Sequence, residues 1–96
     1  MVGARHLYRS RFVYDDGAIR EIVIWQVPKD RDRLHGLKYR CHYQHSDGQQ
    51  WVRYDNERRK GDHRHINARE MPYEFRDFGQ LVRDFLSDIR AMRGEP

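Results

Sequence analysis

The sequence predicts an α+β fold: an antiparallel β-meander of four to five strands with a C-terminal amphipathic helix packed on one face. Two observations predict it. Segments of alternating side-chain character in the first two thirds of the chain are separated by Asp-Gly turns, a strong signal for β-hairpins. The last third instead repeats its apolar residues every three to four positions, which indicates a helix. A length of 96 residues suits one domain, so we expect a single domain over residues 1–96.

The first hairpin is predicted around Asp15-Asp16-Gly17. The segment before it, residues 7–14, alternates aromatic side chains with arginine. The segment after it, residues 19–27, is rich in β-branched side chains on both parities, so we expect a central strand covered on both sides. Pro28 ends this strand, because proline cannot donate to a β-ladder.

A second hairpin is predicted at Ser46-Asp47-Gly48, which joins residues 39–44 to residues 50–55. A short fifth strand is expected over residues 63–66, after a loop hinged at Gly61. Residues 71–73, Met-Pro-Tyr, are interpreted as a connector to the helix. Among the strand aromatics, we expect Trp25 and Tyr39 to pack in the core, because strand positions alternate between core and solvent.

The helix is predicted to run from about Asp77 to Arg93. Asp77 is a suitable N-cap with Gln80 three residues on, and Gly94 is a suitable stop. The apolar side chains of this segment fall on one helical face, which should lie on the sheet. They are Phe78, Leu81, Val82, Phe85, Leu86, Ile89 and Met92.

Composition limits the classes of function. A net charge of +4 and a pI near 9.5 permit a nucleic acid or an acidic protein as partner. The single cysteine, Cys41, excludes an internal disulfide and a cysteine-based zinc cage, and we expect it to be buried. No leader-like segment and no stretch of membrane-spanning length stands out, so we expect a soluble, cytoplasmic protein without membrane contact.

The main functional signal is the segment of residues 54–65, Tyr-Asp-Asn-Glu-Arg-Arg-Lys-Gly-Asp-His-Arg-His, which has no aliphatic side chain. In an extended strand, His63 and His65 project from the same face. Imidazole titrates near neutral pH, so one histidine could accept the proton of a ribose 2′-hydroxyl. The other, or a neighbouring acid, would protonate the leaving 5′-oxygen. Such cleavage needs no metal and requires RNA, because DNA lacks the 2′-hydroxyl.

Tyr54-Asp55-Asn56-Glu57, followed by Lys60-Gly61-Asp62-His63-Arg64-His65, resembles the TumE family of small toxins from bacterial type II toxin–antitoxin systems. The Tyr14-Asp15-Asp16-Gly17 hairpin and the C-terminal helix also fit this family. The resemblance implies a ribonuclease-type toxin that inhibits translation. It also implies a small antitoxin partner, often a helix-turn-helix protein, and an oligomer of the toxin alone or with its antitoxin would be compatible with it.

Residue roles within the segment follow from side-chain chemistry. We expect His63, His65, Lys60 and Glu57 to form the catalytic set. Cationic and polar neighbours would bind RNA and stabilise the charge that develops on its phosphate. This binding set comprises Arg58, Lys60, Arg64, Tyr54 and Asn56, with Tyr54 stacking on a base. Asp55 and Glu57 would orient a histidine or serve as an alternative base, or else only pair with nearby arginines.

We expect no metal and no other cofactor. Asp62, His63 and His65 are suitable ligands, but residues 62 and 63 point to opposite sides of an extended strand. A three-ligand site would need a bulge or a distant partner such as Glu57, and the flanking cations oppose a second positive charge.

Two other functions are compatible with the sequence. One is a non-enzymatic module that uses the basic segment 53–69 only to hold RNA or DNA. The other is a group-transfer toxin that modifies RNA or protein, although no phosphate-cradling glycine loop supports an enzyme using a nucleotide. In each case the antitoxin is expected to cover residues 53–69, which hold six Lys or Arg against three Asp or Glu. The alternative is docking on the exposed face of the C-terminal helix.

Overall fold

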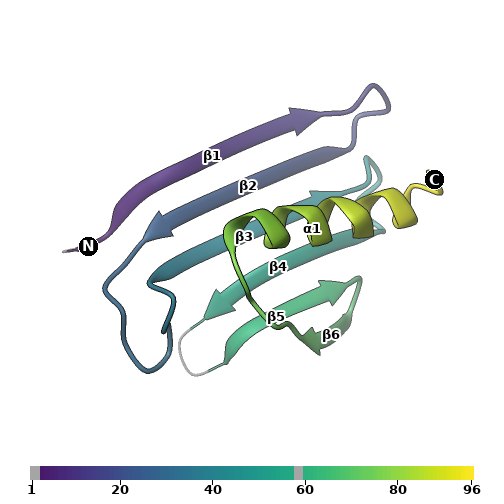
Figure 1. The fold of residues 1–96 in the computed structure, drawn as a ribbon. Helices are drawn as coiled ribbons and strands as arrows, with labels where there is room; N and C mark the ends of the chain where they lie inside the picture. Colours follow the sequence, from purple (N-terminus) through teal and green to yellow (C-terminus); the bar gives the residue numbers. More distant parts are fainter. Residues whose placement is uncertain (1–2, 58–59) are drawn as a thin grey trace.

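The computed structural model describes residues 3–57 and 60–96 and confirms the α+β class. Its described strands form one antiparallel sheet in chain order, and a helix lies across one face of that sheet (Figure 1). The elements are β1 (Arg5–Val13), β2 (Ile19–Gln26), β3 (Leu37–Gln44), β4 (Trp51–Glu57), β5 (Gly61–Ile66), β6 (Arg69–Pro72) and α1 (Phe78–Met92). The sheet has six strands, slightly more than predicted, because part of the expected connector pairs with β5 as β6.

Both predicted hairpins are present, and their turns show why the sequence specifies them. Gly17 and Gly48 have φ angles of 90° and 73°, a region in which a side chain would be strained. Asp16 and Asp47 precede these glycines, and each carboxylate accepts a hydrogen bond from a backbone N–H two residues on, at 3.0 and 2.9 Å. Such local bonds stabilise a turn independently of the rest of the fold.

The helix begins and ends as predicted. The Asp77 side chain caps it by accepting the backbone N–H of Gln80 at 2.7 Å, and Gly94 lies just beyond the end with a φ of 69°. Leu81, Phe85 and Ile89 are buried against the sheet. These three α1 side chains pack on core residues of β2, β3 and β4 that share one face of the sheet. These are Ile22, Ile24, Tyr39, Cys41, Tyr43, Val52 and Tyr54.

The opposite face of the sheet has no helix over it in the described part of the chain, as the ribbon shows (Figure 1). The prediction that residues 19–27 form a strand covered on both sides was therefore wrong. Ile22 and Ile24 are buried under the helix, whereas Val23 and Trp25 are only half-buried on the other side. Tyr39 is in the core as expected, but Trp25 is not. A single helix can pack on only one of the two faces of a sheet.

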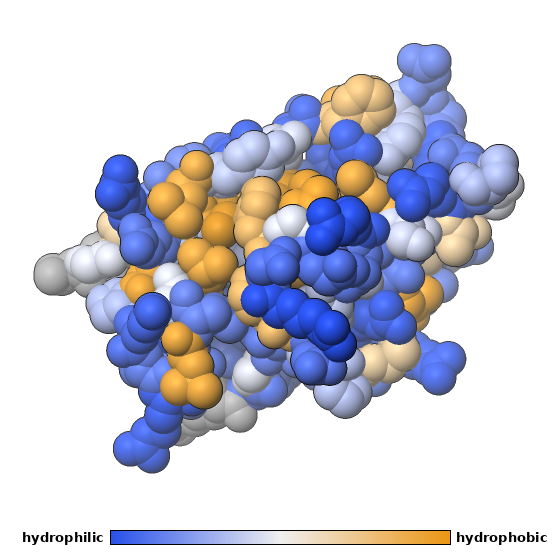
Figure 2. All heavy atoms as spheres, in the orientation of Figure 1, coloured by the Kyte–Doolittle hydropathy of each residue, from blue (hydrophilic) through white to orange (hydrophobic). Residues whose placement is uncertain are grey.

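Several exposed apolar side chains lie beside α1 at the β1 edge of the sheet. Leu7, Tyr8 and Phe12 of β1 and Phe78 of α1 are 38–47% exposed. Figure 2 shows hydrophobic residues gathered on this helix-covered face of the molecule. No helix of the described residues is long and apolar enough to cross a membrane.

Candidate active site on the uncovered face of the sheet

The uncovered face brings Asp55, His63 and His65 together. Asp55 of β4 pairs with His63 of β5, and Arg53 pairs with His65 in the same register. Residues paired across an antiparallel ladder point to the same face, so all four side chains project away from α1. The ligand atoms of Asp55, His63 and His65 all lie within 4.8 Å of one another. The two imidazole rings are 5.3 Å apart, which agrees with the shared face that their spacing predicts.

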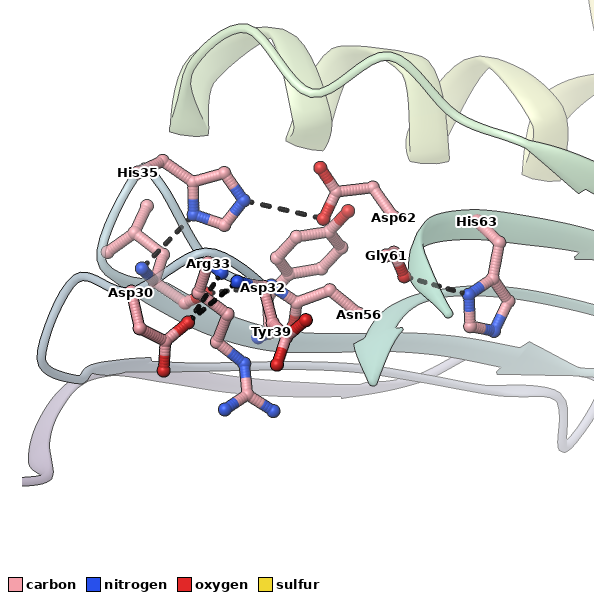
Figure 3. Close-up of polar contacts among 10 residues, drawn as sticks. Asp30, Asp32, Arg33, His35, Tyr39, Asn56, Gly61, Asp62 and His63 are labelled. Atoms are coloured by element: carbon pink, nitrogen blue, oxygen red, sulfur yellow. Dashed lines mark hydrogen bonds and ion pairs between the residues drawn. The ribbon is translucent and has the colours of Figure 1, made fainter. Parts of the chain in front are cut away.

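His63 is held at both ring nitrogens. Its Nδ1 lies 3.1 Å from the Gly61 carbonyl oxygen (Figure 3), and its Nε2 lies 2.6 Å from Asp55 Oδ1. The Gly61 carbonyl can only accept, so Nδ1 is the protonated nitrogen in this contact. The Asp55 oxygen and His63 Nε2 are close but not aligned as a hydrogen bond, and Oδ1 is a buried atom without a hydrogen-bond partner. His63 itself is only 4% exposed.

His65 is the more accessible histidine. It is half-buried, and its ring lies 5.6 Å from that of Trp51 and 5.3 Å from that of His63. A ligand resting on the uncovered face can therefore reach His65, while His63 lies beneath it with both nitrogens occupied. The two histidines have different environments although the sequence presents them as an equivalent pair.

A cationic hollow of about 460 Å³ adjoins Asp55 on the same face. Three of its lining side chains are the cations Lys38, Arg40 and Arg53, and Arg40 pairs directly with Asp55 across β3 and β4. The complete lining is Trp25, Lys38, Tyr39, Arg40, Arg53, Asp55, Asn56 and Glu57. An anionic group such as a phosphate would meet three cations here, against the two carboxylates of Asp55 and Glu57, beside the histidine cluster.

Lys38 and Arg40 do not stand out in the sequence, because each lies in an ordinary alternating strand, and Arg53 enters only as the first residue of the basic segment 53–69. One signal could have found them. The hairpin at residues 46–48 sets the even positions of β3 opposite the odd positions of β4, and these positions include the three cations and Asp55. The parity of two paired strands, taken together, therefore predicts the cluster.

Further cations and two tryptophans share this face. Lys38 Nζ lies 5.5 Å from the ring centroid of Trp25, and the Arg53 guanidinium lies 5.3 Å from that of Trp51. By register, Arg9 and Arg11 of β1 also belong to this face, where Arg9 forms a 3.4 Å ion pair with Glu21. Cations interleaved with aromatic rings can neutralise phosphates and stack bases.

Three residues of the predicted binding set lie instead on the helix side of the sheet. Tyr54 is fully buried; its hydroxyl donates to Asp88 and accepts from Arg64 Nη1 at 3.2 Å. Burial and the bond to Asp88 raise the pKa of Tyr54 above its usual range. Asn56 is buried as well, and its amide donates to the Leu37 carbonyl at 2.7 Å. These side chains join β-strands to each other and to α1, and the sheet separates them from His63.

Arg64 is tied to the helix by a 3.3 Å ion pair with Asp88. Asp62 is also on the helix side, where its carboxylate meets His35 at 3.3 Å, and Figure 3 shows it pointing away from His63. The metal-ligand trio considered from the sequence, with Asp62 as its acid, is therefore not assembled. Asp55 takes that place beside the two histidines.

The remaining predicted residues lie near the end of the cluster. Glu57 is exposed and lines the hollow, and Lys60 is exposed in the turn that leads into β5. The Lys60 backbone N–H donates to the Glu57 carbonyl at 3.2 Å. Arg58 lies outside the described residues, as does Arg59.

The fold and the site define a small α+β protein with a cationic, aromatic sheet face around a histidine–aspartate cluster. A sequence model of the family described as Toxin TumE matches residues 3–93. The chain therefore belongs to the TumE toxin family, which makes it a toxin and implies an antitoxin as its partner. No curated protein and no solved structure matched it.

Proposed function

We propose that this toxin is a metal-independent endoribonuclease that cleaves RNA on the uncovered face of its sheet and so inhibits translation in the cytoplasm. The observation that carries the proposal is the convergence of Asp55, His63 and His65 beside the cationic hollow. Groups for proton transfer and groups for phosphate binding are both needed for RNA cleavage. Here they lie on adjoining parts of one face.

RNA binding is assigned to the hollow and its surroundings. Lys38, Arg40 and Arg53 would hold a phosphate, since each phosphate contact releases a counterion and favours association. Trp25 and Trp51 are half-buried and so offer ring surface to bases. Stacking of this kind contributes about 1–3 kcal/mol per base. Lys60, and Arg58 as predicted from the sequence, would bind further phosphates along the RNA.

The chemistry begins at His65, the histidine that a bound strand can touch. Its imidazole accepts the proton of the ribose 2′-hydroxyl, and the 2′-oxygen attacks the adjacent phosphorus. The bond from phosphorus to the 5′-oxygen breaks, which leaves a 2′,3′-cyclic phosphate on one fragment. The leaving 5′-oxygen takes a proton from a second group, for which Lys60 is the accessible candidate, because His63 is buried and its Nδ1 donates to the Gly61 carbonyl. Glu57 at the rim of the hollow is the alternative base.

Incubation of the purified toxin with end-labelled RNA in EDTA tests this proposal. We expect fragments that end in a cyclic phosphate, and no cleavage of an all-deoxy strand of the same sequence. His65→Ala should lower the rate by about 10²–10⁴-fold, the usual contribution of a positioned acid or base. His6→Ala is the matched control, because His6 is an exposed histidine that belongs to the same face on β1.

The second candidate function is non-enzymatic binding of RNA or DNA. The cations and tryptophans of the uncovered face favour it, because they would suffice for binding without any histidine chemistry. Growth arrest by His65→Ala at normal expression, together with intact RNA in the cleavage assay, would establish binding and exclude the ribonuclease. A mass increase on RNA or on a cellular protein would instead indicate a group-transfer toxin.

For the antitoxin, we propose a helix-turn-helix protein whose acidic or amphipathic segment covers residues 53–69. This range contributes Arg53, Asp55, His63 and His65 to the uncovered face, so a partner there would block the RNA path directly. Hydrogen exchange on the complex should protect residues 53–69, and RNA should be displaced. Protection confined to residues 77–93, with RNA still bound, would contradict this surface and show that neutralisation acts through α1.

A further inference from the structure

When His63 is neutral, its close contact with Asp55 needs a bound cation to be favourable. Because Nδ1 of His63 donates to the Gly61 carbonyl, Nε2 of a neutral His63 carries no proton and lies only 2.6 Å from Asp55 Oδ1. That oxygen is itself a buried acceptor without a hydrogen-bond partner. Two acceptors at this distance repel each other unless a positive centre lies between or beside them.

His65 brings a third ligand to the same point. One ligand atom each from Asp55, His63 and His65 lies within 4.8 Å of the others. In a tetrahedral zinc site with bonds of about 2.0–2.1 Å, neighbouring ligand atoms are about 3.3 Å apart. Small side-chain rotations would therefore bring the three atoms to coordinating distance. Two imidazoles and one carboxylate are a ligand set that transition metals such as Zn²⁺ accept.

The surroundings of the cluster also fit a metal ion. A histidine that binds a metal usually donates its other ring N–H to a carbonyl or carboxylate, as His63 does to Gly61. Of the neighbouring cations, Arg64 pairs with Asp88 on the helix side and Arg53 lies against the Trp51 ring, whereas Arg40 is on the same face opposite Asp55. The side chains of His63 and Asp55 are only 5% and 13% exposed, so water competes weakly for the ion.

We infer that Asp55, His63 and His65 form a binding site for one divalent transition-metal ion of the Zn²⁺ class, and that its occupation inhibits the toxin. The bound ion takes the lone pairs of both histidines, so neither can accept a proton from RNA. Mg²⁺ is a poor occupant, because it prefers an oxygen-rich shell. The inhibitory part of this inference rests on the proposed ribonuclease activity, whereas the binding part does not.

Metal titration of the full chain tests the binding part without RNA. Protein stripped with EDTA and then desalted is titrated with Co²⁺, followed by visible absorption, and with Zn²⁺, followed by calorimetry. We expect one ion per chain. His63→Ala, His65→Ala and Asp55→Asn should each weaken binding by at least about 100-fold, beyond the about 10–100-fold that loss of an outer partner causes. His6→Ala should bind as the unchanged protein does.

Circular dichroism of each variant shows whether it folds. If His63→Ala does not fold, because His63 is buried, His65→Ala at the half-buried position still tests the site. No Co²⁺ spectrum, or the same affinity in His65→Ala, overturns the inference whatever happens to RNA. A bound ion in a protein that never cleaves RNA leaves the site standing and defeats the ribonuclease proposal. Cleavage by the Zn²⁺-saturated toxin at or above the metal-free rate overturns the inhibitory role.

Discussion

At the scale of single residues, His63 and His65 look equivalent in the sequence but differ in burial and in hydrogen-bond partners. His63 is 4% exposed and bridges the Gly61 carbonyl and Asp55, whereas His65 faces solvent on one side. Proton transfer to a substrate needs access, and a buried group acts mainly through what it holds in place. We therefore assign substrate contact to His65, with His63 as its buried neighbour.

The first prediction is that replacing His63 and replacing His65 have different effects on the stability of the protein. His63→Ala should lower the free energy of unfolding by about 1–3 kcal/mol, because it leaves a cavity at a buried position and removes the hydrogen bond to the Gly61 carbonyl. His65→Ala should change it by no more than about 0.5 kcal/mol, as is usual for accessible positions. Urea unfolding followed by circular dichroism measures both values. Equal losses in the two variants would contradict the difference in burial.

At the scale of secondary-structure elements, paired strands β3 and β4 build the part of the site that binds anions. Lys38 and Arg40 come from β3, and Arg53 and Asp55 come from β4. The antiparallel register places Arg40 beside Asp55, so neither strand alone contains the hollow. Rigid strands suit this function, because they hold charged groups at fixed spacing along a nucleic-acid backbone.

The second prediction concerns the salt dependence of RNA binding. Arg40→Ala should lower the slope of log K against log salt by about 0.7, the value for one contact to single-stranded nucleic acid. Lys60→Ala should lower it by a similar amount if the strand continues past the hollow. Filter binding at several salt concentrations measures the slope. Arg83→Ala, on the exposed side of α1, is the control and should leave it unchanged.

An unaltered slope in Arg40→Ala would place RNA away from the hollow. An unaltered slope in Lys60→Ala alone would limit the contact to the hollow and leave Lys60 as a solvated residue of the turn.

At the scale of the whole molecule, buried and half-buried tyrosines join the sheet to the helix and to the segment that precedes it. Tyr54 reaches Asp88 and Tyr73 donates to Asp84 at 2.6 Å, while Tyr39 packs against Phe75 with the ring centroids 5.5 Å apart. Burial is the largest cause that raises the pKa of Tyr39, Tyr54 and Tyr73 above the ordinary value for a phenol. Hydrogen bonding to the nearby carboxylates Asp88 and Asp84 raises the pKa of Tyr54 and Tyr73 further.

The third prediction follows from the sign of these shifts. The folded state keeps the phenols protonated, whereas the unfolded chain loses the protons near pH 10. The stabilisation is therefore fully present below about pH 10 and is lost as the pH rises above it. The share of tyrosinate absorbance that comes from Tyr39, Tyr54 and Tyr73 should appear only together with the loss of helical circular dichroism. Smooth titration of all tyrosines in a folded protein would contradict the burial of these side chains.

Local chemistry in the sequence is enough to predict both hairpins and the helix of this fold. The Asp-Gly turns, the Asp77 cap and the apolar period of residues 78–92 each act within a few residues, so they can be recognised without the rest of the molecule. Burial of Cys41 also follows from its alternating strand, and the structure buries it fully and raises the pKa of its thiol to about 12.

Long-range pairing decided what local patterns could not. The strand Arg69–Pro72 has only four residues, one of which is a proline. It is a strand because it pairs with β5. Which sheet face the helix covers likewise depends on packing of the whole chain. That choice moved Tyr54, Asn56 and Arg64 away from the predicted site, because adjacent strand residues point to opposite faces.

The sequence by itself determined the α+β class, the hairpins, the helix, the likeness to the toxin family and the shared face of His63 and His65. Only the tertiary structure placed Asp55 against His63, whereas the shared face of Lys38, Arg40 and Asp55 also follows from the hairpin parity of β3 and β4. The physical reason is the β-sheet register. Hydrogen bonds between strands bring together residues that are distant in the chain, and no local property of either strand states which residues will face each other.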